Sequence, residues 1–209
     1  MSKKTNSQTA CFVLPGGYQE ECRLDMQKDR RLVFLINGLA LCVFLIGGII
    51  GHLFVPIQTF YSMSEGMLMY FVRLAAVCGG MVLYIFLHEF VHGIFIKHYS
   101  GRKARYGFTV LYAYAGSEAY FNKYQYFVIA LAPLAVWGIF LTGLLIFVPK
   151  SWFWIVYFIQ LANISGASGD LYVVWKIFGM RGDILIRDNG TDMIVYAPAQ
   201  EDGIEQESR

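Results

Sequence analysis

The stretch Leu74 to Ile96, which reads LAAVCGGMVLYIFLHEFVHGIFI, decides how this chain folds. It is long and apolar enough to cross a bilayer as one helix, because about 20 residues rising about 1.5 Å each span roughly 30 Å of hydrocarbon. Its second half nevertheless carries three ionisable side chains, in the order His88-Glu89-Phe90-Val91-His92. Placing such groups in hydrocarbon costs free energy, so they normally face a polar interior and mark a functional site.

The residues from His88 to His92 form an HExxH pattern. On a helix the two histidines lie on one face, where they can share one zinc ion, and the glutamate between them can deprotonate a water molecule on that metal. A bare HExxH also occurs by chance in soluble helices, but the cost of inserting it into a membrane makes chance a poor explanation here. We therefore expect Zn²⁺, with His88 and His92 as ligands and Glu89 as the general base.

The composition of the whole chain is that of a membrane protein. Hydrophobic residues make up 56% of its 209 residues, charged residues only 15%, and the mean hydropathy is +0.48, which is too apolar for a soluble domain. The net charge of +2 does not indicate a nucleic-acid partner, and neither a basic helix nor a glycine-rich phosphate loop is present. Cys11, Cys22, Cys42 and Cys78 show no CxxC spacing, so neither a disulfide framework nor a thiolate zinc site is expected.

Charge-free runs long enough to cross a bilayer predict four transmembrane helices. Their approximate bounds are residues 32–55, 74–96, 124–148 and 151–175. The chain then divides into a cytoplasmic N-terminal segment (1–31), a four-helix transmembrane domain (32–176) and a cytoplasmic C-terminal hairpin and tail (177–209). The predicted fold class is an all-α membrane protein with two small β-hairpins.

Both hairpins are expected on the cytoplasmic side. The loop from Arg105 to Tyr124, between the second and third spans, is rich in β-forming residues with a break at Gly116-Ser117, which predicts two short strands. In the tail, residues 184–187 and 193–196 flank Asp188-Asn189-Gly190, a strong turn signal. The first hairpin could bind an extended substrate by strand addition, whereas the second is interpreted as a structural cap.

Lysine and arginine are unevenly distributed among the connections. Residues 1–31 hold six of the 17, residues 97–123 hold five, and the tail from residue 176 holds four, whereas the two other connections hold only Arg73 and Lys150. The positive-inside rule therefore predicts an integral membrane protein with both termini in the cytoplasm.

The same topology brings a third ligand to the depth of the two histidines. His88 and His92 precede Lys97, the first lysine after their span, by nine and five residues. Asp170 precedes Lys176, at the same side of the membrane, by six residues. At about 1.5 Å per residue the three side chains fall within roughly 6 Å of one another along the membrane normal. Asp170 is therefore expected to complete a site with three protein ligands and one open position.

Asn163 lies seven residues before Asp170, so both side chains share one face of the predicted fourth span. The small residues between them allow a close helix contact. Asn163 is predicted to hold the substrate backbone or to stabilise an oxyanion, which is a catalytic role. Two alternatives remain open, since Asp170 could instead extend to the membrane interface and Asn163 could only bond between helices.

Two further patterns are interpreted as structural. Pro133 removes one helical hydrogen bond from the third span and is read as a kink that opens the cavity. Gly47 and Gly51 form a GxxxG pattern, which indicates a helix contact.

Five segments carry a resemblance to a known family: HEFVHG from His88, Tyr106-Gly107-Phe108, Ala113-Tyr114-Ala115, Ala130-Leu131-Ala132-Pro133-Leu134, and Asn163 to Leu171. Over about residues 80–197 the chain resembles the putative zincin peptidase family of bacterial integral membrane proteins. In arrangement it is also similar to site-2 proteases, in which an aspartate on a later helix, preceded by an asparagine, joins HExxH. Glycine precedes Asp170 here and no proline lies between Asn163 and Asp170, whereas site-2 proteases have an Asp-Gly pair with proline upstream. The resemblance therefore supports His88 and His92 as zinc ligands more firmly than it supports Asp170 as the third ligand.

The resemblance implies peptide hydrolysis in or near the bacterial cytoplasmic membrane, with Zn²⁺ on His88, His92 and Asp170 and with Glu89 as general base. The expected partners are the lipid bilayer and a peptide or membrane-protein substrate, and the sequence does not indicate an oligomeric state. The alternative interpretation is a non-catalytic membrane zinc-binding protein, such as a carrier, a sensor or a scaffold.

Overall fold

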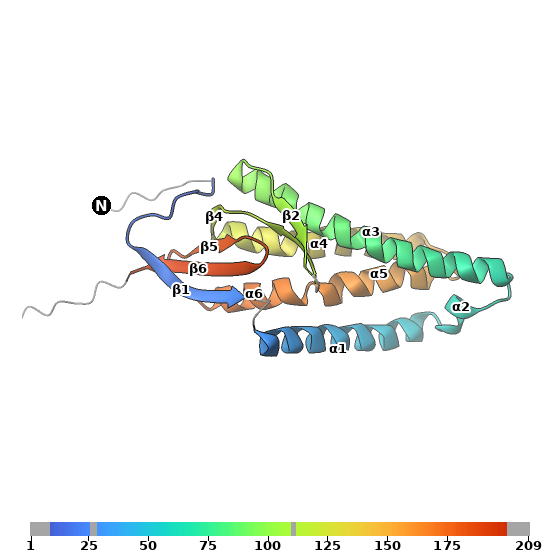
Figure 1. Ribbon diagram of the computed structural model, residues 1–209. Helices are drawn as coiled ribbons and strands as arrows, with labels where there is room; N and C mark the ends of the chain where they lie inside the picture. Colours follow the sequence, from blue (N-terminus) through green and yellow to red (C-terminus); the bar gives the residue numbers. More distant parts are fainter. Residues whose placement is uncertain (1–8, 26–28, 110–111, 200–209) are drawn as a thin grey trace, which may run out of the picture.

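The computed structural model describes residues 9–25, 29–109 and 112–199, which form a mostly helical molecule with its strands gathered at one end (Figure 1). Three helices in these parts are long and apolar enough to cross a membrane, namely α1 (Arg30–Phe54), α3 (Met67–Ser100) and α4 (Lys123–Phe147). The short helix α2 (Gln58–Tyr61) lies at the end away from the strands. The predicted class is therefore confirmed in its coarse form, a mainly helical chain compatible with a membrane.

The predicted fourth span, residues 151–175, is not a single helix. It forms α5 (Phe153–Gly166) and α6 (Ser168–Phe178), which meet at Ala167. Serine and glycine favour helix ends, because a serine hydroxyl competes for backbone carbonyls and glycine has high conformational freedom. The Ser168 hydroxyl donates to the carbonyl of Ser165 at 2.6 Å. Among the described residues three helices are candidate spans, so the predicted count of four spans is not confirmed.

Capping residues set the helix ends nearest the strands. At the start of α1, the Asp29 side chain accepts from the backbone N–H groups of Arg31 and Leu32. At the start of α4, Asn122 and Gln125 form a reciprocal capping box. Gly101, with a φ of 71°, follows α3 in the left-handed conformation that favours glycine.

The larger sheet has the strand order β1-β6-β5-β4, and its neighbouring strands are antiparallel. Its strands are β1 (Tyr18–Asp25), β4 (Tyr120–Asn122), β5 (Leu185–Asp188) and β6 (Asp192–Pro198). The pair β5–β6 forms the hairpin predicted in the tail, with Leu185 opposite Tyr196 and Gly190 at a φ of 94° in the turn. The pairing of β1 with β6 was not predicted, and because of this sheet the chain is not all-α.

The loop after α3 forms the second sheet, in which β2 (Arg105–Phe108) pairs with β3 (Ala113–Gly116). Two short strands were predicted here with a break at Gly116-Ser117, but β3 ends at Gly116, so this break follows both strands and does not separate them. Next to the paired residues, the backbone N–H of Thr109 donates to the carbonyl of Tyr112 at 2.8 Å. After β3 the chain enters the larger sheet as β4.

Helix α5 lies among the other helices and packs against α1, α3 and α4. Close approach depends on glycines, as the GxxxG pattern of α1 predicted. A Cβ atom at Gly51 would lie 2.3 Å from Cε1 of Tyr157, and one at Gly47 would lie 2.3 Å from Cδ2 of Leu161. The predicted helix contact is confirmed at both glycines.

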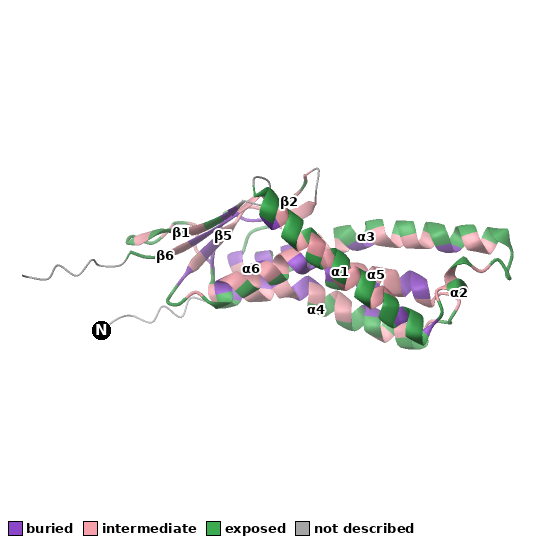
Figure 2. Ribbon diagram, turned by 90° about the horizontal axis from the view of Figure 1, so that it is seen from below, coloured by how far each residue is buried: buried purple, intermediate pink, exposed green. Residues whose placement is uncertain are grey.

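The outer faces of the long helices are exposed and apolar (Figure 2). Large exposed side chains include Phe34, Leu53, Ile139 and Phe147. A continuous apolar surface of this kind is unfavourable in water and suits contact with lipid. A core of buried apolar side chains lies at the strand end, where Phe121, Ile186 and Val195 of the larger sheet pack with Ile177 of α6.

Candidate metal centre

Helix α3 places the three residues of the HExxH pattern on one side of a cavity. One ligating atom from each of His88, Glu89 and His92 lies within 4.8 Å of the others. This follows from helical spacing, since residues three and four positions apart are neighbours on a helix surface. The ring centroids of His88 and His92 are 4.9 Å apart.

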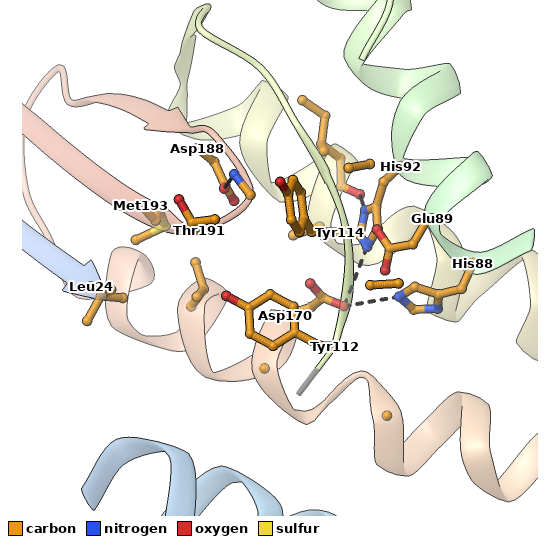
Figure 3. A pocket seen from close by; sticks show the side chains of 18 of the residues that line it. Leu24, His88, Glu89, His92, Tyr112, Tyr114, Asp170, Asp188, Thr191 and Met193 are labelled. Atoms are coloured by element: carbon orange, nitrogen blue, oxygen red, sulfur yellow. Dashed lines mark hydrogen bonds and ion pairs between the residues drawn. The ribbon is translucent and has the colours of Figure 1, made fainter. Parts of the chain in front are cut away.

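Asp170, in the first turn of α6, faces both histidines (Figure 3). Its Oδ2 atom lies 3.5 Å from Nε2 of His88 and 3.7 Å from Nε2 of His92. Bonds of about 2.0–2.1 Å in tetrahedral geometry separate two zinc ligands by roughly 3.3 Å. These donor distances and the two-imidazole, one-carboxylate chemistry therefore fit a zinc ion.

Two acidic residues, Glu89 and Asp170, lie close enough to the histidines to be considered as the third ligand. Asp170 is the better choice, because the Nε2 atoms of both imidazoles lie near the same carboxylate oxygen of Asp170. Glu89 then remains available for proton transfer, which is the role that HExxH gives to its glutamate.

The hydrogen bonds behind the histidines fix their tautomers. Nδ1 of His92 lies 2.8 Å from the carbonyl oxygen of Ile129, which can only accept, so Nδ1 carries the hydrogen. Nδ1 of His88 lies 2.8 Å from the Tyr84 hydroxyl, and that hydroxyl donates its single hydrogen to Oδ1 of Asn163 at 3.0 Å. His88 must therefore donate from Nδ1 as well. Both Nε2 atoms are left with lone pairs directed toward Asp170, as a metal site requires.

Asn163 lies behind His88 and is fully buried at 0% exposure. Its Oδ1 accepts from Tyr84, and its Nδ2 donates to the carbonyl of Leu134 at 3.3 Å. Sequence reasoning placed this amide against the substrate, but the structure places it among helix contacts and outside the lining of the cavity. Of the five predicted site residues, the structure gathers His88, Glu89, His92 and Asp170 around the cavity, and Asn163 supports His88 through Tyr84.

The cavity beside these residues has a volume of about 450 Å³ and is lined by residues from β1 to β6 along the chain. Leu24 of β1 and Asn37 of α1 line one part of it, and Tyr112 and Tyr114 of the loop after α3 line another. A space of this size accommodates several residues of an extended peptide or a small ligand. The sequence did not predict that the N-terminal strand contributes to the wall.

Two glycines, Gly116 and Gly190, allow the β2–β3 sheet to lie close to the turn between β5 and β6 beside the cavity. A Cβ atom at Gly116 would lie 2.2 Å from the backbone of Asn189, and one at Gly190 would lie 1.9 Å from the Tyr114 ring. The backbone N–H of Ser117 donates to the carbonyl of Asp188 at 2.7 Å. The C-terminal hairpin is therefore fixed against β3 and forms part of the cavity wall.

Asp188 is an acidic residue that sequence reasoning did not include in the site. It lines the cavity and accepts from the Tyr126 hydroxyl at 2.5 Å and from the backbone N–H of Gly190 at 2.9 Å. Burial raises the pKa of Asp188, whereas the hydrogen bond from Tyr126 acts in the opposite direction. These contacts join the hairpin turn to α4, so we interpret Asp188 as a residue that fixes the hairpin.

The comparison with known families agrees with this geometry. Residues 81–185, which cover half of the chain, match the model of a family described as a putative zincin peptidase. The chain belongs to this zincin peptidase family. The matched segment runs from Met81 in α3 to Leu185, the first residue of β5, and includes His88, Glu89, His92 and Asp170. No curated protein and no solved structure matches the chain, and the likeness in arrangement to site-2 proteases stays a prediction.

Proposed function

We propose that this zincin-family protein is a membrane-embedded zinc metallopeptidase that hydrolyses peptide bonds in or near the membrane. The observation that carries the proposal is the position of Asp170, whose Oδ2 atom lies 3.5 and 3.7 Å from the Nε2 atoms of the two HExxH histidines. Glu89 is in the same group of donors and lines the same cavity. Three ligands and a neighbouring base are the parts that a hydrolytic zinc site needs.

Each residue of the centre has a distinct role in this proposal. His88, His92 and Asp170 hold the metal, which when bound supplies the Lewis acidity that makes water nucleophilic near neutral pH. Glu89 accepts a proton from the attacking water and transfers it to the amine that leaves. Asn163 acts as a positioning residue, because it orients the Tyr84 hydroxyl that accepts from His88.

The substrate we propose is an extended peptide chain that lies along β3. Ala113, Tyr114 and Ala115 of this strand line the cavity, and β3 pairs with β2 along one edge. An extended peptide that adds a strand to the other edge would have its backbone fixed beside Glu89. Such a substrate is a peptide or a segment of a membrane protein.

We also propose that the protein lies in a bacterial cytoplasmic membrane with the strand end of the molecule in the cytoplasm. The three long apolar helices support insertion into a membrane, and the excess of lysine and arginine in the segments near the strands supports this orientation.

The test compares the wild-type protein with Glu89→Gln and His88→Ala. Glu89→Gln should retain one zinc ion per chain, because the ligands are intact, and should lose hydrolysis by about 10²-fold to 10⁴-fold because the general base is absent. His88→Ala should lose the metal. Zinc is measured by elemental analysis of the purified proteins, and hydrolysis by comparing the membrane peptides of cells that contain each form.

Identical peptides in wild-type and Glu89→Gln cells, with zinc bound to both proteins, would contradict the peptidase proposal. That result would favour the non-catalytic carrier, sensor or scaffold. A wild-type protein without zinc would contradict the metal centre itself.

A further inference from the structure

Pro133 lies in the interior of α4 and interrupts the hydrogen bonds of that helix. In an α-helix each backbone N–H donates to the carbonyl four residues earlier, so residue 133 would pair with Ile129. Proline has no N–H, and its ring also crowds the carbonyl at that earlier position. The carbonyl of Ile129 therefore receives no hydrogen bond from residue 133.

This carbonyl is the one that binds His92. Nδ1 of His92 lies 2.8 Å from the oxygen of Ile129. All three residues are buried, with His92 at 8% exposure, Ile129 at 5% and Pro133 below 2%. A buried carbonyl requires a donor, and in membrane helices a neighbouring side chain commonly supplies the bond that a proline removes.

We propose that Pro133 is a positioning residue for the metal centre, because it reserves the Ile129 carbonyl for His92. The bond to a carbonyl oxygen forces the hydrogen onto Nδ1, which leaves the Nε2 lone pair directed toward Asp170. The inference rests on the proposed zinc site, but it concerns the tautomer and orientation of His92 before any metal binds.

The two histidines are thus oriented by different means. The acceptor for His88 is the Tyr84 hydroxyl, a side chain of the same helix, whereas the acceptor for His92 is a backbone atom of α4. The residue type at position 129 does not determine whether its backbone carbonyl is free to accept from His92. Pro133, four positions further along the chain, leaves that carbonyl without its helical donor.

The experiment restores the missing N–H group with Pro133→Ala. The new N–H would donate to Ile129, and His92 would share its acceptor or lose it. Loss of the hydrogen-bond acceptor of a ligating histidine typically weakens metal binding by about 10-fold to 100-fold. The helix itself gains a hydrogen bond and a better helix former, so the thermal unfolding midpoint of the metal-free protein should hold or rise.

The measurements are zinc affinity, by competition with a chelator, and the unfolding midpoint of the metal-free protein in the same detergent. Pro149→Ala is the matched control, since Pro149 lies between α4 and α5 outside both helices. It should leave zinc affinity unchanged. Pro133→Gly is the second variant, because glycine also restores the N–H and tolerates any bend that α4 adopts, and it should weaken zinc binding as well.

Weaker zinc binding by both variants, with an unfolding midpoint for Pro133→Ala no lower than that of the wild type, supports the inference. Wild-type zinc affinity in either folded variant overturns it. A parallel fall in affinity and midpoint for Pro133→Ala also overturns it, because the proline would then act by maintaining the fold. Absence of zinc from the wild-type protein would contradict the proposed function instead, so the two failures can be distinguished.

Discussion

At the scale of single residues, Tyr84 determines the tautomer of His88, because Tyr84 has only one hydroxyl hydrogen. Because that hydrogen goes to Asn163, the hydroxyl can only accept from His88. Tyr84 is buried at 7% exposure, so water has little access to replace either bond. The orientation of His88, a proposed ligand, therefore depends on two residues outside the proposed ligand set, Tyr84 and Asn163.

Tyr84→Phe should weaken zinc binding by about 10-fold, because His88 loses the acceptor that fixes its tautomer. The buried amide of Asn163 also loses its donor, and an unpaired buried polar group costs about 1–3 kcal/mol. Chelator competition measures the first effect and thermal unfolding the second. Tyr70→Phe, a change of the same atoms elsewhere in α3, is the control and should alter neither quantity. Unchanged zinc affinity in Tyr84→Phe would show that zinc binding does not depend on the hydrogen bond between the Tyr84 hydroxyl and His88.

Single residues differed in how far the sequence could predict them. The gathering of His88, Glu89 and His92 was predictable because helical spacing alone brings them together, and the position of Asp170 near them was predictable from its distance along the sequence to Lys176. Tyr84 could have been found in the same way, since it lies one helical turn before His88. The acceptor of His92 could not, because a backbone carbonyl has no sequence signature of its own.

At the scale of secondary structure, the contact between α1 and α5 depends on glycine. The Tyr157 hydroxyl donates to the carbonyl of Gly47 at 2.7 Å, and its ring occupies the space where a side chain at Gly51 would begin. The contact is one of close packing and contains no side chain from the metal centre.

Gly51→Val should therefore destabilise the protein by about 1–3 kcal/mol, the usual cost of overpacking a well-packed contact. Zinc affinity should remain that of the wild type, because the ligands lie on α3 and α6. Gly48→Val is the matched control on the same helix, where a Cβ atom would meet nothing within 4 Å. Thermal unfolding compares the three proteins, and equal midpoints for Gly51→Val and Gly48→Val would contradict the proposed role of the contact.

The elements themselves were only partly predictable. The hairpin at Asp188-Asn189-Gly190 was predicted because its turn and pairing are local in sequence. The break at Ala167 was missed because hydropathy averages over a window, and serine and glycine between apolar residues hardly change that average. The break nevertheless matters for the site, since it places Asp170 in the first turn of a new helix.

At the scale of the whole molecule, all strands lie at one end of the helices (Figure 1). The positive-inside rule predicts that this end lies in the cytoplasm, because the basic residues are concentrated in the segments that form or adjoin the strands. The orientation can be tested without any knowledge of the substrate.

Single cysteines at Lys103 and Lys150, in a variant whose four native cysteines are replaced by serine, should differ in labelling. In intact cells a membrane-impermeant maleimide should react with Lys150→Cys and leave Lys103→Cys unlabelled. After lysis both should react, which controls for local accessibility. The reverse pattern in intact cells would show that the molecule is inserted the other way.

The larger sheet was beyond prediction from sequence at this scale. Its β1–β6 pair joins segments separated by most of the chain, and strand patterns do not reveal which distant strands will pair. The segment that forms β1 also carries charges at Glu20, Glu21, Arg23 and Asp25, a density as typical of a solvated tail as of a strand.

The pairing of β1 with β6 has a consequence for biosynthesis. The ribosome makes β1 before any of the helices and β6 after all of them, so the first strand has no sheet to join until the last one has emerged. Leu24 from the first strand and Met193 from the last both enclose the space beside the histidines. A nascent chain therefore lacks part of the wall of this cavity until β6 has been synthesised.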